Sequence, residues 1–149
     1  MLTNLIALAT GVLSLAPVQV ALEEVPAALQ GQTWGKMLPN RTVNDVPLTI
    51  NGKPYEHGVG THAHSAWIIP IGRNATRFRA DVGMPLSRDP GATVRFKVYG
   101  DKDLLFESPI MTPTKPAVHV DVDLSGRQEL RLIVTDAGDG TSYDRANWA

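Results

Sequence analysis

Apolar and polar residues alternate with a period of two in the second half of this chain. A period of two predicts β-strands that present one face to a core and the other to water. Turn residues such as Asp89-Pro90-Gly91 and Ser125-Gly126 separate the alternating segments. The segments are residues 78–82, 94–98, 118–124 and 130–135.

The rest of the chain offers little opportunity for long helices. Glycine and proline contribute 13 and 11 of the 149 residues, and no helical period is convincing after residue 30. Two short apolar runs, Pro47–Ile50 and Ala66–Ile71, indicate more deeply buried strands. We therefore predict an all-β domain of about seven to nine short strands, built as a two-layer antiparallel β-sandwich.

Charge and cysteine content exclude several classes of function. The chain has 14 Lys and Arg against 15 Asp and Glu, so its formal net charge is −1. A nucleic-acid partner normally requires a basic surface, so we expect none. The absence of cysteine excludes disulfide frameworks, thiol nucleophiles and cysteine-based zinc sites.

The N-terminal segment differs from the remainder. Residues 1–21 contain no Lys, Arg, Asp or Glu, and the apolar run Leu5–Ala16 has the length of a signal-peptide core. That run is too short for a comfortable membrane span. We predict a leader at residues 1–21, a mature domain at residues 22–149 without a membrane span, and a secreted or cell-surface location. A buried N-terminal segment of a larger protein is the alternative.

Histidine spacing raises the possibility of a metal site. His62 and His64 lie two residues apart, so in an extended segment both imidazoles could face one metal ion. Adding His119 would complete the ligand set of a small metal-dependent hydrolase. His119 argues against this reading, because it occupies the water-facing side of its segment beside Asp121 and Asp123.

Residues 136–144 form an oxygen-rich segment near the end of the chain. It contains Asp136, Asp139 and Asp144, together with two glycines and two hydroxyl residues. Ca²⁺ prefers several oxygen ligands from a tightly folded loop, so these three carboxylates are candidate calcium ligands. The spacing does not match an EF-hand, and a plain Asp/Gly turn is the alternative.

Three tryptophans stand out among few aromatic residues. Trp67 lies in an apolar run and is expected in the core, whereas Trp34 and Trp148 fall outside the alternating segments. Trp148 follows Asp144 and Arg145 closely. An indole beside carboxylate and guanidinium groups suits a sugar, whose apolar face it covers while the polar groups bind hydroxyls. Alternatively, both indoles close the open edges of the sandwich.

The ordered landmarks resemble a known family, the NPCBM domain, also classed as carbohydrate-binding module (CBM) family 51. The resemblance extends from about residue 22 to the end of the chain. The matching stretches are Trp34-Gly35, Gly58–Ala63 (GVGTHA), Val94–Asp101 (VRFKVYGD), Asp136–Gly140 and Trp148-Ala149.

The resemblance implies a β-sandwich of the galactose-binding type that binds glycans, often galactose-containing ones, and is usually attached to a glycoside hydrolase. Some members carry calcium. It implies a non-catalytic module whose hydrolase lies in the same or a separate chain. The residues expected at the binding end are Trp34, His62, Asp144, Arg145 and Trp148.

One departure from the family pattern affects the end of the domain. The pattern continues past Trp148-Ala149 into a short closing strand, so we expect the domain to lack its last strand. A sandwich that keeps the fold but binds another protein is the alternative function.

Overall fold

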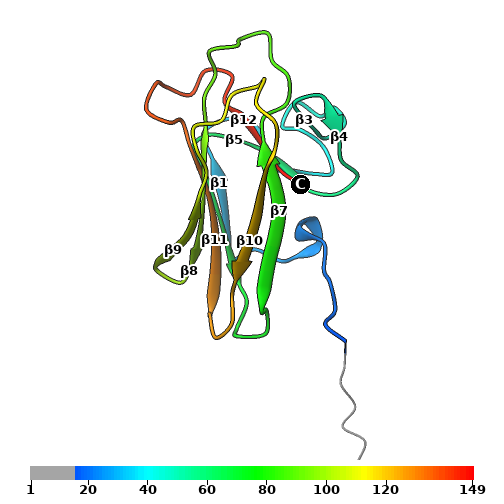
Figure 1. The fold of residues 1–149 in the computed structure, drawn as a ribbon, viewed down its shortest axis with the longest axis vertical. Coiled ribbons are helices and arrows are strands. Elements are labelled where there is room, and N and C mark those ends of the chain that lie inside the picture. Colours follow the sequence, from blue (N-terminus) through cyan, green and yellow to red (C-terminus); the bar gives the residue numbers. More distant parts are fainter. Residues whose placement is uncertain (1–15) are drawn as a thin grey trace, which may run out of the picture.

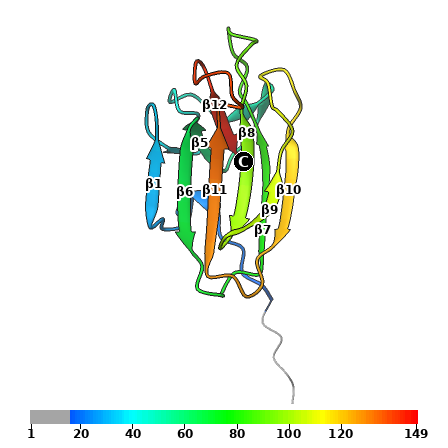
Figure 2. The same ribbon diagram turned by 90° about the vertical axis from the view of Figure 1, so that its left-hand side faces the viewer.

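Two antiparallel β-sheets pack face to face in the computed structural model, which describes residues 16–149 (Figures 1 and 2). The first sheet presents one face to the core and the other to solvent, as alternating burial along its long strands shows. Its strands, in spatial order, are β1 (Leu29–Gln32), β6 (Ser65–Pro70), β11 (Glu129–Thr135), β8 (Arg95–Gly100) and β9 (Asp103–Glu107).

The second sheet covers the other side of the core. Its outer face carries charged residues on the two longest strands, where Arg77 pairs with Asp121. The two-layer antiparallel sandwich predicted from the sequence is therefore confirmed. The strands of this sheet, in spatial order, are β10 (Val118–Asp123), β7 (Arg77–Gly83), β12 (Arg145–Trp148), β5 (Val59–His62) and β2 (Leu38–Pro39).

The four alternating segments form strands β7, β8, β10 and β11, as predicted. The structure contains more strands than predicted because several are too short to show a period. These are β2 and the hairpin of β3 (Thr49–Ile50) and β4 (Lys53–Pro54), each with two residues. The apolar run at 66–71 corresponds to β6.

Strand β12 contains Trp148, which falls outside the alternating segments of the sequence. It occupies the middle of the second sheet, between β5 and β7. Ala146 and Trp148 point into the core, and on the other face Asn147 is buried and donates from Nδ2 to the Thr49 carbonyl at 2.6 Å. Because both faces of β12 are covered, its sequence lacks the apolar–polar alternation of a surface strand.

The core contains two of the three tryptophans. Trp148 is 2% exposed and packs edge-to-face on Phe96 at a centroid distance of 5.0 Å, with Phe78 at 6.3 Å. Trp67 is buried, as predicted. Such aromatic pairs add to the free energy of burial itself, so this cluster holds the two sheets together.

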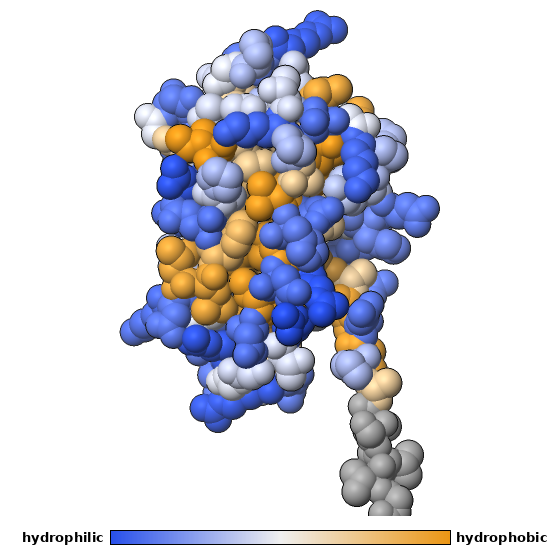
Figure 3. Space-filling view, in the orientation of Figure 1, coloured by the Kyte–Doolittle hydropathy of each residue, from blue (hydrophilic) through white to orange (hydrophobic). Residues whose placement is uncertain are grey.

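One edge of the sandwich is less well covered. Figure 3 shows hydrophobic side chains over β9 and along the opening between the two sheets. Leu104 is exposed there, while Leu105, Phe106 and Val118 are partly buried against the core. This edge lies away from the loops described below.

The N-terminal part of the described chain packs beside the sandwich. A three-residue 3₁₀ turn, η1 (Leu22–Glu24), places Leu22 against the core and Glu23 beside His57, with Oε1 2.7 Å from Nδ1. Most of the predicted leader at residues 1–21 lies outside the described residues. No helix within residues 16–149 is long and apolar enough to cross a membrane.

Candidate functional site

Three chain segments meet at one end of the sandwich. Strand β1 ends there, β5 ends at His62, and β12 begins at Arg145 after the 136–144 loop (Figure 1). His62 and Arg145 are directly opposite in the antiparallel pairing of β5 and β12, so their side chains leave the sheet on the same face. An open hollow of about 300 Å³ lies there, lined by Trp34, His62, Thr141, Ser142, Tyr143 and Arg145.

Trp34 forms one wall of this hollow. Its side chain is 54% exposed, and its ring lies 5.4 Å from the His62 ring at an angle of 57°. Its backbone is held by Gln32, whose Nε2 donates to the Trp34 carbonyl at 2.6 Å and whose Oε1 accepts from Thr61 at 2.7 Å. Gly35 follows with φ +71°, where a Cβ would lie 2.8 Å from Val43. The indole therefore sits on a fixed turn while its ring faces solvent.

His62 forms the base of the hollow. It is 6% exposed, and its Nδ1 lies 2.6 Å from the Ala63 carbonyl oxygen, which can only accept. Nδ1 therefore carries the proton. Burial and the nearby charge of Arg145 lower the pKa of His62. The imidazole is thus neutral near pH 7, and Nε2 is left as a hydrogen-bond acceptor.

Tyr143 and Arg145 form the opposite wall. Tyr143 is 50% exposed, and the Arg145 guanidinium carbon lies 5.5 Å from the centroid of its ring. This stacking orients the guanidinium without using its N–H groups. Within residues 16–149, Arg145 takes part in no ion pair.

Asp144, between these two residues, faces the opposite direction. Its side chain is fully buried, and neither carboxylate oxygen has a hydrogen-bond partner in the described part of the chain. Burial, reinforced by the negative charges of Asp139 and Asp136, raises the pKa of Asp144 to about 7. Asp144 directly precedes β12 and is buried, so, contrary to the expectation, it does not line the hollow in this structure.

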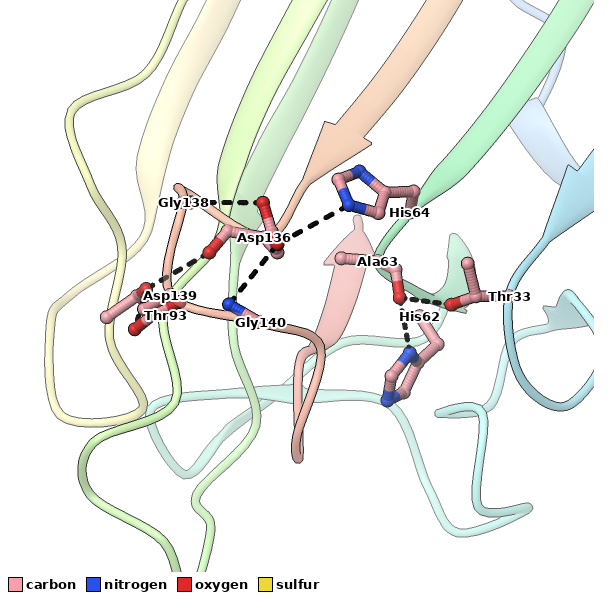
Figure 4. A network of polar contacts seen from close by, with 9 residues as sticks. All are labelled: Thr33, His62, Ala63, His64, Thr93, Asp136, Gly138, Asp139 and Gly140. Atoms are coloured by element: carbon pink, nitrogen blue, oxygen red, sulfur yellow. Dashed lines mark hydrogen bonds and ion pairs between the residues drawn. The ribbon is translucent and has the colours of Figure 1, made fainter.

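The other two predicted calcium ligands are used in the loop itself. Asp136 accepts from the backbone N–H groups of Gly138 at 3.0 Å and Gly140 at 3.3 Å, and its Oδ2 lies 3.4 Å from His64 Nε2 (Figure 4). Asp139 accepts from the Thr93 hydroxyl at 2.7 Å. Among residues 16–149, no three His, Asp or Glu side chains converge on one metal position. Asp136 and Asp139 are each engaged in hydrogen bonds within the described chain, and the calcium site stays a prediction.

The histidines do not form a metal site either. Strand β5 ends at His62 in the second sheet and β6 begins at Ser65 in the first, so His62 and His64 do not share one extended strand. Figure 4 shows the His64 imidazole turned toward Asp136 and the His62 imidazole on the opposite side. His119 lies on the outer face of the second sheet, with its Nδ1 2.9 Å from Asp81. The geometry gives no support to a histidine-dependent hydrolase.

Of the five residues expected to bind, the structure brings Trp34, His62 and Arg145 together. Trp148 is a core residue and not a surface indole, because β12 turns it inward. Sequence reasoning did not assign Thr141, Ser142 and Tyr143 to the hollow. Continuing the period of two back from Arg145 would have placed Tyr143 on the same face.

Comparison with known proteins now identifies the chain. A model of the NPCBM/NEW2 domain family matches residues 18–149. The chain belongs to this family. The resemblance noted in the sequence is confirmed, and the chain is an NPCBM/CBM51 carbohydrate-binding module.

Solved structures of related modules share its fold. The CBM51 from Clostridium perfringens GH95, solved in complex with methyl-galactose, is 27% identical with a TM-score of 0.79 and covers 87% of this chain and 95% of its own. The CBM51-2 and INT domains of Clostridium perfringens ZmpB, solved with GlcNAc, are 25% identical with a TM-score of 0.81. That alignment covers 87% of this chain and 30% of the other.

Curated relatives are much larger proteins. Alpha-1,3-galactosidase B of Akkermansia muciniphila is 30% identical over 132 residues, which is 84% of this chain and 16% of the galactosidase. A putative endo-alpha-N-acetylgalactosaminidase of Renibacterium salmoninarum is 29% identical over 105 residues, covering 69% of this chain and 7% of the relative. The NPCBM module thus corresponds to a small part of each.

Proposed function

We propose that the hollow between Trp34, His62 and Arg145 binds a terminal sugar of a galactose-containing glycan and that the module itself is non-catalytic. The observation that carries this proposal is the convergence of an exposed indole, a buried neutral imidazole and a guanidinium at one open hollow. The likeness to a module solved with methyl-galactose supports it. In this role the module would hold an associated glycoside hydrolase on its substrate.

The chemistry of the hollow suits a pyranose ring. The Trp34 indole would cover the apolar face of the sugar, while His62 Nε2 accepts from one hydroxyl and Arg145 donates to another. A volume of about 300 Å³ is at the lower limit of typical ligand pockets, which suits one sugar residue. One open site offers few contacts, so the monovalent affinity should be of micromolar to millimolar order.

The carboxylates of the chain favour binding over catalysis. Glycoside hydrolysis usually needs an acid and a base placed around the bond to be cleaved. Within residues 16–149, no carboxylate lines the hollow. Asp121, on the outer face of the second sheet, has its pKa lowered by hydrogen bonding to Arg77, so it cannot hold a proton as a general acid.

A calcium ion beside Asp144 is part of the proposal. Both Asp144 oxygens are buried without partners, and a buried carboxylate is stable in its charged form only when a cation or donors face it. Asp139 and Asp136 lie close enough to raise the pKa of Asp144 further. Ca²⁺ held by Asp144 would supply the missing positive charge and fix the loop that precedes Arg145.

An extracellular location completes the proposal. The apolar segment at residues 1–21 supports export, and glycans displayed outside cells are the matching ligands. Expression of the full chain followed by N-terminal sequencing of secreted protein tests this. A secreted form beginning near Leu22 supports the proposal, and full retention in the cytoplasm contradicts it.

A glycan array and calorimetry with methyl galactoside test the binding function. The unmodified module should bind galactose-terminated glycans, and Trp34→Ala should abolish the signal. Leu104→Ala is the matched control and should keep the signal, because Leu104 is an exposed hydrophobic residue on β9, away from the hollow. An absence of any glycan signal at high protein density rules the proposal out, and so does equal binding by Trp34→Ala.

A further inference from the structure

We propose that the glycan bound in the hollow carries an anionic group, a sulfate ester or a carboxylate, which Arg145 recognises. This inference rests on the sugar-binding function proposed above and specifies its ligand class. The residues that line the hollow carry a net positive formal charge. Of the six residues that line the hollow, Arg145 is cationic and none is a carboxylate.

Arg145 differs from most arginines of the module. Six others form ion pairs with a carboxylate, and Arg145 forms none within residues 16–149. Its charge is therefore uncompensated at a surface that is concave and partly buried. The paired residues are Arg41 with Asp45, Arg77 and Arg79 with Asp121, Arg95 with Glu107, Arg127 with Asp103, and Arg131 with Glu129.

The carboxylates nearest in sequence are directed elsewhere. Asp144 is fully buried, Asp136 accepts from the Gly138 and Gly140 amides, and Asp139 accepts from Thr93. Figure 4 shows Asp136 directed toward His64 and Asp139 toward Thr93, both apart from the His62 imidazole. None of these groups occupies the position of an acceptor for Arg145.

The guanidinium is also held in a favourable orientation. Its stacking on Tyr143, at 5.5 Å from the ring centroid, leaves the N–H edge free. A planar guanidinium donates two parallel N–H bonds to an oxyanion, which is stronger and more selective than donation to a hydroxyl. His62 is neutral because burial and Arg145 lower its pKa, so it adds an acceptor and no second charge.

The test compares neutral and anionic sugars under identical conditions. Calorimetry would measure the binding of methyl galactoside, a sulfated methyl galactoside and a sialylated galactoside at low salt. The two anionic arms distinguish a sulfate ester from a carboxylate. At least one anionic sugar should bind about tenfold tighter than the neutral sugar, and the ratio should fall as salt rises.

Two variants assign the effect to Arg145. In Arg145→Gln the ratio of anionic to neutral affinity should collapse to about one. The matched control is Arg73→Gln, which removes the same charge from an exposed turn between β6 and β7 and should keep the ratio. Circular dichroism would verify that both variants are folded.

The outcomes separate this inference from the function on which it rests. If methyl galactoside binds as tightly as both anionic sugars, the inference is overturned while the sugar-binding function stands. Inorganic sulfate that competes as well as the sulfated sugar also overturns it, because the hollow would then bind a bare anion. If no sugar binds at all, the proposed function itself fails.

Discussion

Two neighbouring residues at the same end of the sandwich have opposite surroundings. Arg145 lies in an open hollow with aromatic rings and no carboxylate, whereas Asp144 is buried without a partner beside other acidic residues. The two residues are adjacent in sequence, where the chain enters β12. Arg145 provides a candidate ligand contact, whereas Asp144 and Trp148 are buried.

This contrast shows that the direction of a side chain, more than its residue type, decides whether the residue lies at the hollow or in the interior. Trp34 and Trp148 have the same side chain, but one is 54% exposed on a turn and the other is packed between the sheets. The two charged residues differ in the same way, because the half-buried Arg145 faces the hollow, whereas the fully buried Asp144 requires a cation to be stable in its charged form. The predictions below test that division.

Truncating the two tryptophans should give the largest difference. Trp148→Ala removes the indole packed on Phe96 and should lower the free energy of unfolding by about 3–5 kcal/mol. Trp34→Ala should change it by about 0.5 kcal/mol or less, because its ring faces solvent. Urea denaturation of both variants measures this. Equal losses of stability would remove the distinction between core and hollow.

Asp144→Asn should change how stability depends on pH. The folded-state pKa of Asp144 is raised to about 7, above its value in the unfolded chain. Its contribution is therefore fully present below about pH 4 and is lost as the pH rises toward 7. With calcium chelated at pH 8, Asp144→Asn should be more stable than the unmodified module, because the variant has no charge to bury.

Calcium provides the control for that comparison. Added Ca²⁺ should raise the Tm of the unmodified module at pH 8 and leave the Tm of Asp144→Asn unchanged. The Asp103→Asn variant, which alters an exposed acid on β9, should keep the calcium response. A calcium response that survives in Asp144→Asn would show that the ion binds elsewhere.

Acidification should weaken sugar binding through His62. The pKa of His62 is lowered below its usual value of about 6.5, so the affinity for methyl galactoside should stay constant from pH 8 to about 6.5. At lower pH, protonation removes the Nε2 acceptor and the affinity should fall. Calorimetry across this range is the measurement. His62→Gln should bind more weakly but without this pH dependence.

Tyr143 should give the smallest effect. Tyr143→Ala removes the ring beneath Arg145 and should weaken binding about threefold, in keeping with an exposed cation–π contact of about 0.5–1 kcal/mol. Tyr143→Phe keeps the ring and should lose less. If both variants lose the same affinity, the hydroxyl and not the ring is the important group.

Much of the fold could be predicted from the sequence because its long strands have one solvent-exposed face and one buried face. Strands β7, β8, β10 and β11 alternate clearly, and this alone indicates two antiparallel sheets. Strand β12 could not be recognised in the same way. Asn147 is covered by the β3–β4 hairpin, so both faces are buried and the alternation disappears.

Only part of the candidate site could be predicted from the sequence, because the position of β12 could not be recognised. Trp34, His62 and Arg145 were named from their chemistry, and the pairing of β5 with β12 brings them together. The burial of Asp144 and Trp148 cannot be predicted from the sequence, because residues 145–148 lack the alternation of a surface strand. It follows only from the position of β12 between β5 and β7. The three carboxylates of the loop were close in sequence, but local turns direct them to different partners.

The central place of β12 in the second sheet also has a consequence during protein synthesis. Strands β5 and β7 leave the ribosome before β12 and remain without the neighbour that joins them. The hollow likewise combines Trp34 with Arg145, which is made more than a hundred residues later. A nascent chain that still lacks β12 also lacks Arg145, so the proposed binding hollow can be completed only after the last strand has been synthesised and added to the sheet.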